Sequence, residues 1–106
     1  TLHVPLTDLT RDMIDETVLR KMQRTSYLIN TSRGSVVNSS ALHKALLSGE
    51  ISGAALDVFC SEPPNDMEFL QLPNLMVTPH IGGNSVEAVE AMGQAAIDNL
   101  VAFLKK

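Results

Sequence analysis

Residues 51–59 read ISGAALDVF, an apolar run that is interrupted only by Ser52, Gly53 and Asp57. Short apolar runs of this kind are typical of strands in a parallel sheet. Gly49 precedes the run as the expected end of a helix, and a loop begins after it at residues 63–64, which are both proline. We therefore expect a buried strand within this stretch.

The same alternation extends to both sides of this strand. Residues 2–4, 27–29 and 75–77 are three further short apolar runs, and Asp15, Asn38 and Ser85 are suitable caps for three helices, the last of which runs nearly to the end of the chain. Strands that alternate with helices indicate βαβ units. We expect an α/β, Rossmann-like three-layer fold with a mostly parallel sheet of about four strands, flanking helices and a long C-terminal helix. The link between the third and fourth strands contains no clear helix, so that pair is either antiparallel or joined by a long loop.

Composition limits the classes of partner. The 106 residues suit one small domain, and a net charge of −4 argues against a nucleic-acid partner. One cysteine excludes an internal disulfide, and no apolar run is long enough to span a membrane, so we expect a cytoplasmic protein.

The sequence opens on Thr1-Leu2-His3-Val4, without methionine, as if within a strand, and we expect the natural chain to begin earlier.

Polar or glycine residues follow each apolar run at its carboxyl end. In an open α/β sheet, ligands bind outside the carboxyl ends of the strands, so these residues are expected to converge on one edge. They are His3 and Thr7 after the first run, Thr31, Ser32 and Arg33 after the second, Asp57 and Glu62 after the third, and His80, Gly82 and Gly83 after the fourth.

Each of these residues also has an ordinary structural explanation. Arg33 could stabilise a strand-to-helix turn, and Asp57 could be a buried polar group with satisfied hydrogen bonds. Glu62 could be a solvated loop carboxylate, and His80 a strand-end histidine. Together, however, a cation, a carboxylate and an imidazole can bind a small anionic substrate and move a proton.

Other chemistries are disfavoured. The three histidines lie far apart and there is no second cysteine, so we expect no metal site. Ser32 lacks the Gly-x-Ser-x-Gly pattern of a hydrolase nucleophile, and no glycine-rich phosphate loop is present. We interpret Cys60 as a packing residue and His43 as a surface side chain.

Four segments resemble the D-2-hydroxyacid dehydrogenase family in order and in spacing. They are His3-Val4-Pro5-Leu6-Thr7, Leu28-Ile29-Asn30-Thr31-Ser32-Arg33-Gly34, Gly53-Ala54-Ala55-Leu56-Asp57-Val58-Phe59 with Glu62-Pro63, and Thr78-Pro79-His80-Ile81-Gly82-Gly83. The resemblance implies a Rossmann-type cofactor domain and hydride transfer between a nicotinamide cofactor and a 2-oxo or D-2-hydroxy acid.

The resemblance also implies roles for individual residues. Arg33 is similar to the arginine that binds the substrate carboxylate and polarises the carbonyl, which suits a two-pronged guanidinium. His80 resembles the general acid, or the base in the oxidative direction, and Glu62 its partner, because a nearby carboxylate favours the imidazolium. Asp57 resembles the acceptor for the nicotinamide carboxamide. The implied cofactor-binding positions are Val4, Pro5, Thr31, Ser32, Arg33, Asp57, His80, Gly82 and Gly83.

The chain departs from the family pattern in two places. The Gly-x-Gly-x-x-Gly turn and the following acidic residue are missing, as is most of the substrate domain. We therefore interpret residues 1–106 as the C-terminal half of a cofactor domain that is inactive alone, and NAD, with NADP still possible, as the cofactor. At residues 38–40 the family usually shows an acidic helix start, but Asn38 still supplies a cap.

Several alternatives stay open at this point. The substrate could be that of a 3-phosphoglycerate dehydrogenase, a glyoxylate or hydroxypyruvate reductase, or a D-lactate dehydrogenase, with formate and phosphite dehydrogenases less favoured. A dinucleotide-sensing binding protein, similar to the C-terminal-binding corepressors, is the alternative from another functional class. An uncovered first strand and an apolar last helix further predict self-association, for example as a homodimer.

Overall fold

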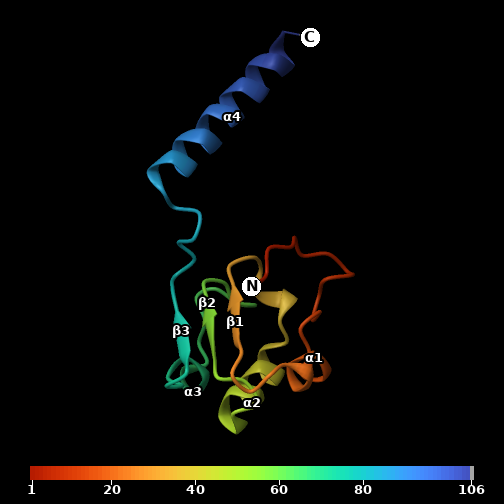
Figure 1. Cartoon of the computed structure of the whole chain (residues 1–106). Coiled ribbons are helices and arrows are strands. Elements are labelled where there is room, and N and C mark those ends of the chain that lie inside the picture. The colour runs from red at the N-terminus through yellow and green to blue at the C-terminus, as the bar shows by residue number, and fades with distance from the viewer. Residues whose placement is uncertain (106) are drawn as a thin grey trace.

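The computed structural model describes residues 1–105, which are built around a three-stranded sheet. The strands β1 (Tyr27–Asn30), β2 (Gly53–Leu56) and β3 (Leu75–Val77) lie in that order and are all parallel (Figure 1). The β2–β3 pair is thus parallel, and the loop that joins these strands contains one short helix, α3 (Met67–Leu70). The predicted α/β class and parallel sheet are confirmed.

The expected strand at residues 2–4 is reduced to a single bridge. The Leu2 amide donates to the Ile29 carbonyl at 3.0 Å, and Leu2 forms an isolated parallel bridge with Asn30. Pro5 has no N–H group with which to extend such a ladder. The sheet therefore has three strands where about four were expected, and the segment at Leu2 runs beside the outer edge of β1.

The three expected helix starts are all capped by the predicted side chains. These helices are α1 (Glu16–Lys21), α2 (Ser39–Ser48) and α4 (Val86–Leu104). The cap oxygens accept from backbone amides three residues ahead, Asp15 from Val18 at 2.9 Å, Asn38 from Ala41 at 2.9 Å and Ser85 from Ala88 at 3.1 Å. A 3-10 turn, η1 (Gly34–Val36), follows β1 and was not predicted.

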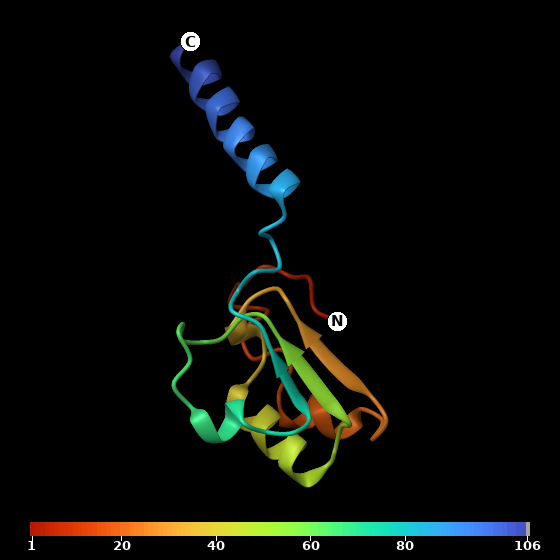
Figure 2. The same ribbon diagram turned by 90° about the vertical axis from the view of Figure 1, so that its left-hand side faces the viewer.

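The core lies on one face of the sheet, beneath α1 and α2. Leu19 of α1 and Leu42 of α2 are buried there together with Leu28 and Leu56 from the strands. The opposite face is bare in the part of the chain that is described, and Tyr27 and Met76 on it are 69% and 66% exposed. Figure 2 shows this sheet with its strands side by side.

Helix α4 extends away from the sheet as an isolated rod (Figures 1 and 2). None of its residues is buried, and the molecule measures 58 × 27 × 24 Å. Its radius of gyration of 17.1 Å exceeds the value of about 13 Å for a compact domain of ~100 residues. Within residues 1–105, no helix combines the length and the apolar character that a membrane crossing requires.

Candidate active site

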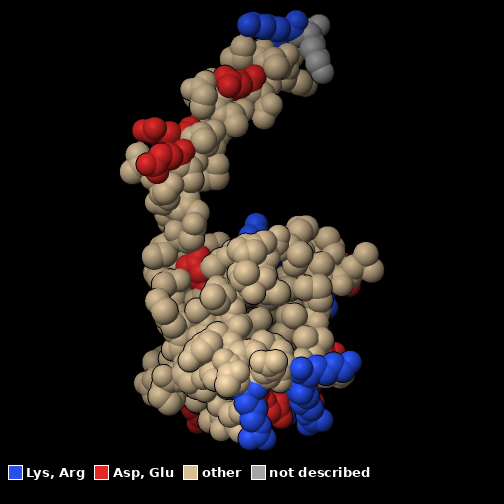
Figure 3. Space-filling model, viewed as in Figure 1, with Lys and Arg blue, Asp and Glu red and all other residues tan. Residues whose placement is uncertain are grey.

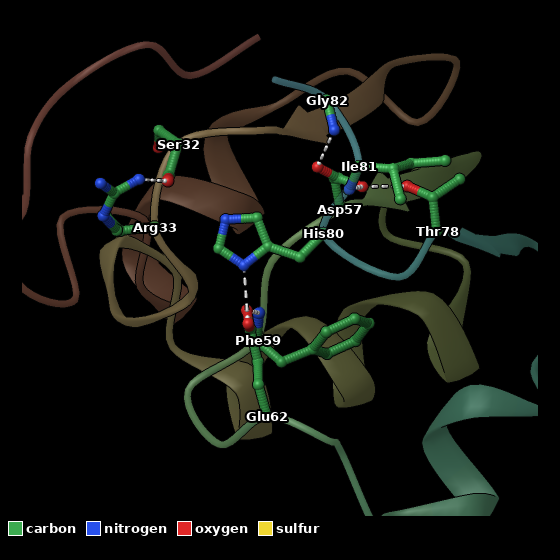
Figure 4. Close-up of polar contacts among 9 residues, drawn as sticks. All are labelled: Ser32, Arg33, Asp57, Phe59, Glu62, Thr78, His80, Ile81 and Gly82. Carbon is green, nitrogen blue, oxygen red and sulfur yellow. Dashed lines mark hydrogen bonds and ion pairs between the residues drawn. The ribbon is translucent and has the colours of Figure 1, made fainter. Parts of the chain in front are cut away.

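The carboxyl ends of the three strands bring the predicted polar residues to one edge of the sheet. Arg33 lies in the loop after β1, Asp57 directly follows β2, and His80 lies in the loop after β3 (Figure 4). On the face shown in Figure 3, most of the Lys and Arg side chains lie over α1 and α2, at the end of the sheet opposite this edge, with a further basic group near the end of α4. The convergence expected from the alternation of strands and helices is therefore present in the structure.

The loop after β1 is organised by the side chain of Asn30, which is 1% exposed. Its Oδ1 accepts from the Ser32 amide at 3.0 Å and from the Ser32 hydroxyl at 2.8 Å, and its Nδ2 donates to the Arg33 carbonyl at 3.0 Å. All three bonds are local, so Asn30 fixes the turn that presents Arg33. Sequence reasoning missed this residue, whose one signal is an amide at the end of an apolar strand.

The guanidinium of Arg33 is free of carboxylate partners among residues 1–105. Its Nη1 donates to the Ser32 carbonyl at 2.6 Å, and the residue is exposed. None of the salt bridges in this part of the chain includes Arg33. Most of its five N–H donors are thus available to an incoming anion.

Glycine at position 34 brings the Arg33 loop against the loop that follows β2. A Cβ atom at Gly34 would lie 2.0 Å from the Phe59 carbonyl carbon and 2.4 Å from the Cys60 amide nitrogen. No larger residue fits at that separation. The two loops that carry Arg33 and Glu62 are therefore in direct backbone contact.

His80 and Glu62 form a close pair at the same edge. The imidazole Nδ1 lies 2.6 Å from Glu62 Oε2, and Glu62 Oε1 accepts from the Phe59 amide at 2.9 Å. The Phe59 amide holds one carboxylate oxygen of Glu62, so the orientation of this carboxylate does not depend on His80 alone. Figure 4 shows Nδ1 directed at Glu62 and the other ring nitrogen directed toward the side on which Arg33 lies.

These contacts also set the ionisation of Glu62. Hydrogen bonding to His80, and then to the Phe59 amide, lowers the pKa of Glu62 below its ordinary value of 4.5, against an opposing effect of desolvation. Glu62 is therefore ionised at neutral pH. An ionised carboxylate only accepts hydrogen bonds, so the Nδ1 atom of His80 carries the shared hydrogen and Nε2 is left for other chemistry.

Asp57 is 5% exposed and accepts three hydrogen bonds from the loop after β3. Its Oδ1 accepts from the Thr78 hydroxyl at 2.5 Å and the Ile81 amide at 2.9 Å, and its Oδ2 accepts from the Gly82 amide at 2.8 Å. The Thr78 hydroxyl is the main cause of a lowered pKa for Asp57, followed by the Ile81 amide. Buried polar groups require such partners, and here all of them come from the loop that carries His80.

The remaining predicted cofactor residues are small or exposed and lie near this edge. Thr31, Gly82 and Gly83 are exposed, and a Cβ atom on Gly82 would lie 4.0 Å from that of Thr31. Val4 and Pro5 follow the Leu2 bridge and so continue past the end of β1. A pocket of about 70 Å³ opens beside Asp57, and it is lined by Ile29, Thr31, Ala55, Leu56, Asp57, Met76 and Thr78.

A second pocket, of about 400 Å³, adjoins the His80–Glu62 pair. Apart from the paired side chains and Thr78, its lining is apolar, from Phe59, Pro63, Pro64, Leu70, Val77 and Pro79. Within residues 1–105, no cluster of three or more His, Cys, Asp or Glu side chains is arranged to hold a metal ion.

Comparison with known proteins assigns this arrangement to a family. The family described as "D-isomer specific 2-hydroxyacid dehydrogenase, NAD binding domain" matches residues 1–82. The chain belongs to this family. The predictions of the family and of its fold are confirmed, whereas the roles of individual residues stay predictions.

Relatives in the D-isomer specific 2-hydroxyacid dehydrogenase family include several named enzymes. The chain is 48% identical to a glycerate dehydrogenase of Methylorubrum extorquens, covering 98% of this chain and 34% of that protein. It is 50% identical to a glyoxylate reductase of Thermofilum pendens, covering 98% and 31%. The chain thus spans about a third of the length of these dehydrogenases.

Solved structures of the same family share this architecture. A glyoxylate/hydroxypyruvate reductase from Sinorhizobium meliloti, in complex with NADP and malonate, superimposes with a TM-score of 0.90 at 40% identity over 95% of this chain and 32% of its own. An NAD complex of a dehydrogenase from Lactobacillus delbrueckii gives 0.88 at 34% identity over 98% and 36%. Because the match covers nearly all of this chain, it includes most of the extended helix α4.

Proposed function

We propose that the full-length protein containing this chain is an oxidoreductase that transfers a hydride between NAD(P) and a D-2-hydroxy acid or its 2-oxo acid. The observation that carries the proposal is the 2.6 Å pair of His80 and Glu62 at the same sheet edge as the free guanidinium of Arg33, in a chain of this dehydrogenase family. A proton donor and an anion-binding cation are the two functions that this reaction requires of the protein.

In this proposal Arg33 binds the substrate. Its planar guanidinium donates two parallel hydrogen bonds to the substrate carboxylate and polarises the neighbouring carbonyl of the substrate. Lysine cannot reproduce this geometry, because an ammonium group is a point charge. The turn fixed by Asn30 and the close approach of Gly34 to Phe59 hold the arginine near the loop that carries Glu62.

His80 supplies the proton from Nε2 to the carbonyl oxygen during reduction and receives it during oxidation. Glu62 accepts from Nδ1, keeps the ring in one orientation and stabilises the imidazolium. Such a positioned proton donor contributes roughly 10²–10⁴-fold in rate. A bound nicotinamide supplies the hydride in the reductive direction.

The edge beside Asp57 fits a nicotinamide. A Cβ atom on Gly82 would lie 4.0 Å from that of Thr31, which lines the 70 Å³ pocket, and the exposed residues Gly82 and Gly83 have no side chains to keep a ligand from the backbone. A carboxylate has about four acceptor positions, of which the loop occupies three at Asp57, so one is left for a carboxamide N–H. Val4, Pro5, Thr31 and Ser32 complete the proposed cofactor contacts.

We further propose that residues 1–106 form the C-terminal half of a Rossmann-type cofactor domain. The glycine-rich turn and the substrate domain would then lie outside this sequence, consistent with its span of about a third of its relatives. The 106 residues alone are expected to show no turnover. The proposed partners are a small 2-oxo or 2-hydroxy acid and a second copy of the protein.

The deciding experiment is an assay of the full-length protein for NADH and NADPH oxidation with a panel of 2-oxo acids. Glyoxylate and hydroxypyruvate come first, because relatives at 48–50% identity are named glycerate dehydrogenase and glyoxylate reductase. We expect turnover with at least one acid and a product of D configuration. Cofactor binding without turnover on any acid would instead favour a nicotinamide-sensing binding protein.

Two substitutions test the assigned roles. We expect His80→Ala to lower kcat far more than it weakens cofactor binding, whereas His43→Ala, in a helix outside this edge, serves as the matched control. We expect Arg33→Lys to lower kcat/KM for the acid because the two-pronged contact is lost. Equal losses of turnover and cofactor affinity in His80→Ala would mean that this residue is structural.

A further inference from the structure

Two carboxylates from one short segment support His80, one through its imidazole and the other through its neighbours in the chain. Glu62 contacts the imidazole, while Asp57 contacts only the backbone and the threonine that flank this residue in the chain (Figure 4). The Thr78 hydroxyl precedes His80 by two residues, and the Ile81 and Gly82 amides follow it. The three bonds to Asp57 therefore enclose Pro79 and His80 between fixed points.

The backbone of His80 requires such support. Its φ angle is +55°, in the left-handed region that non-glycine residues seldom adopt. Pro79 has no N–H group, so it contributes no hydrogen bond of its own to hold the turn. A strained conformation persists only where the surrounding structure determines it from several sides.

We infer that Asp57 is a positioning residue, which fixes the loop on both sides of His80 and thereby directs the imidazole toward Glu62 and the substrate. The inference rests on the proposed function for its consequence in turnover. It adds a second role to the carboxamide contact implied for Asp57, and the two roles use different acceptor positions of one carboxylate. The lowered pKa of Asp57 is consistent with a carboxylate that stays charged in the presence of these donors.

Asparagine at position 57 cannot replace the carboxylate in either orientation of its amide. If its NH₂ group takes the place of Oδ2, it meets the Gly82 amide donor, which lies 2.8 Å from that atom in the native protein. If it takes the place of Oδ1, it meets the Ile81 amide donor, at 2.9 Å. One backbone N–H therefore loses its acceptor in both cases.

The test uses Asp57→Asn in the full-length protein without cofactor. We expect hydrogen exchange in the peptide containing residues 77–84 to quicken on the order of tenfold, because a hydrogen bond to a charged acceptor is lost. We also expect kcat to fall about tenfold or more, with smaller changes in KM for the acid and in the cofactor Kd. Unchanged exchange in this peptide, or a loss confined to cofactor Kd, would overturn the inference.

Two substitutions of Thr78 test the same inference with a smaller change than Asp57→Asn. Thr78→Val removes the hydroxyl donor at nearly constant shape, whereas Thr78→Ser keeps it, so we expect kcat to fall more in the valine variant than in the serine variant. Equal kcat values in the two would also overturn the inference. If the wild-type protein turns over no acid, the proposed function fails, and the exchange comparison still decides whether Asp57 holds the loop.

Discussion

Gly34 lies so close to Phe59 that a Cβ atom on the glycine would be 2.0 Å from the Phe59 carbonyl carbon. The contact joins the loop after β1 to the loop after β2, and these loops carry Arg33 and Glu62. The distance between the proposed anion-binding cation and the proposed acid–base pair therefore depends on the absence of one side chain.

We predict that Gly34→Ala destabilises the protein and separates these loops. Backbone atoms cannot yield as a flexible side chain would, so we expect a loss of roughly 1–3 kcal/mol or more in the free energy of unfolding, together with a loss of turnover. Denaturant unfolding and steady-state kinetics measure the two effects.

A matched control is available in α4. A Cβ atom on Gly93 would meet nothing within 4 Å, and Gly93→Ala in the helix interior is expected to stabilise by about 1 kcal/mol. An unchanged unfolding midpoint for Gly34→Ala would show that the loops can separate without cost.

A second prediction concerns Glu62→Gln. If the glutamine oxygen accepts from His80, its NH₂ group faces the Phe59 amide, and in the reverse orientation it faces Nδ1 of the ring. We expect kcat for reduction to fall about tenfold or more, because either the His80 ring or the Phe59 amide loses its hydrogen-bond acceptor and the ring is no longer held in one orientation. Glu68→Gln, in α3, is the charge-matched control, and an unaltered kcat would contradict the assigned pairing.

The two lowered carboxylate pKa values predict sensitivity to acid. In the folded protein, the pKa of Asp57 lies below 3.8 and that of Glu62 below 4.5, so the unfolded chain binds more protons as the pH falls. The contribution of these two carboxylates to stability is fully present above about pH 5. It is lost as the pH falls below the ordinary pKa values and through the lower pKa values of the folded protein.

The comparison that checks this is the drop in the free energy of unfolding between about pH 6 and about pH 3.5. We expect a smaller drop in the double variant Asp57→Asn/Glu62→Gln than in the wild type. Glu90→Gln, on the exposed helix α4, should leave the drop close to that of the wild type. Equal drops in all three proteins would argue against the hydrogen bonds that lower these pKa values.

Neighbouring glycines allow a fourth prediction. A Cβ atom on Gly82 would lie 2.9 Å from Asp57 Oδ2, an atom that already accepts a hydrogen bond, whereas one on Gly83 meets nothing within 4 Å. We expect Gly82→Ala to quicken hydrogen exchange in the His80 loop of the cofactor-free protein, and Gly83→Ala to leave that exchange unchanged. A Cβ atom on Gly83 meets no protein atom, so a weaker cofactor Kd in Gly83→Ala would come from contact with the cofactor itself. The cofactor Kd of this variant therefore tests the predicted contact between Gly83 and the cofactor. Faster exchange in both variants would contradict this steric account.

Local patterns predicted much of this fold because their physical causes are local. The caps at Asp15, Asn38 and Ser85 act on amides three residues away, so their sequence signal is complete. The direction of β3 could not be predicted in the same way. Helix α3 has only four residues, too few to show a helical period in the sequence.

The sequence predicted which residues lie at the edge of the sheet. It did not predict the hydrogen bonds that hold these residues in place. Parallel strands bring their carboxyl ends together, which brought Arg33, Asp57 and His80 to one edge. The contacts that hold them depend on segments that meet only after folding, such as Asp57 with Gly82, 25 residues apart. At Asn30, an amide at the end of an apolar run was the single signal, and it does not reveal three hydrogen bonds to the following loop.

The last prediction concerns the exposed apolar surface of α4 and of the bare sheet face. Leu100 is 57% exposed and Met92 61%, and Tyr27 is 69% exposed on the sheet, so the 106-residue chain leaves apolar area in water on two elements. We expect this chain to associate with itself, with a mass that rises with concentration in light scattering.

Leu100→Glu should weaken this association by adding a charge to the apolar surface. Gln94→Glu adds the same charge to the same helix at a polar position, where the native amide donates to Asp98 at 2.8 Å, and should have little effect. If the unaltered chain is strictly monomeric at high concentration, its apolar helix does not drive association. An equal response to the two glutamates would mean that net charge, rather than burial of α4, governs the assembly.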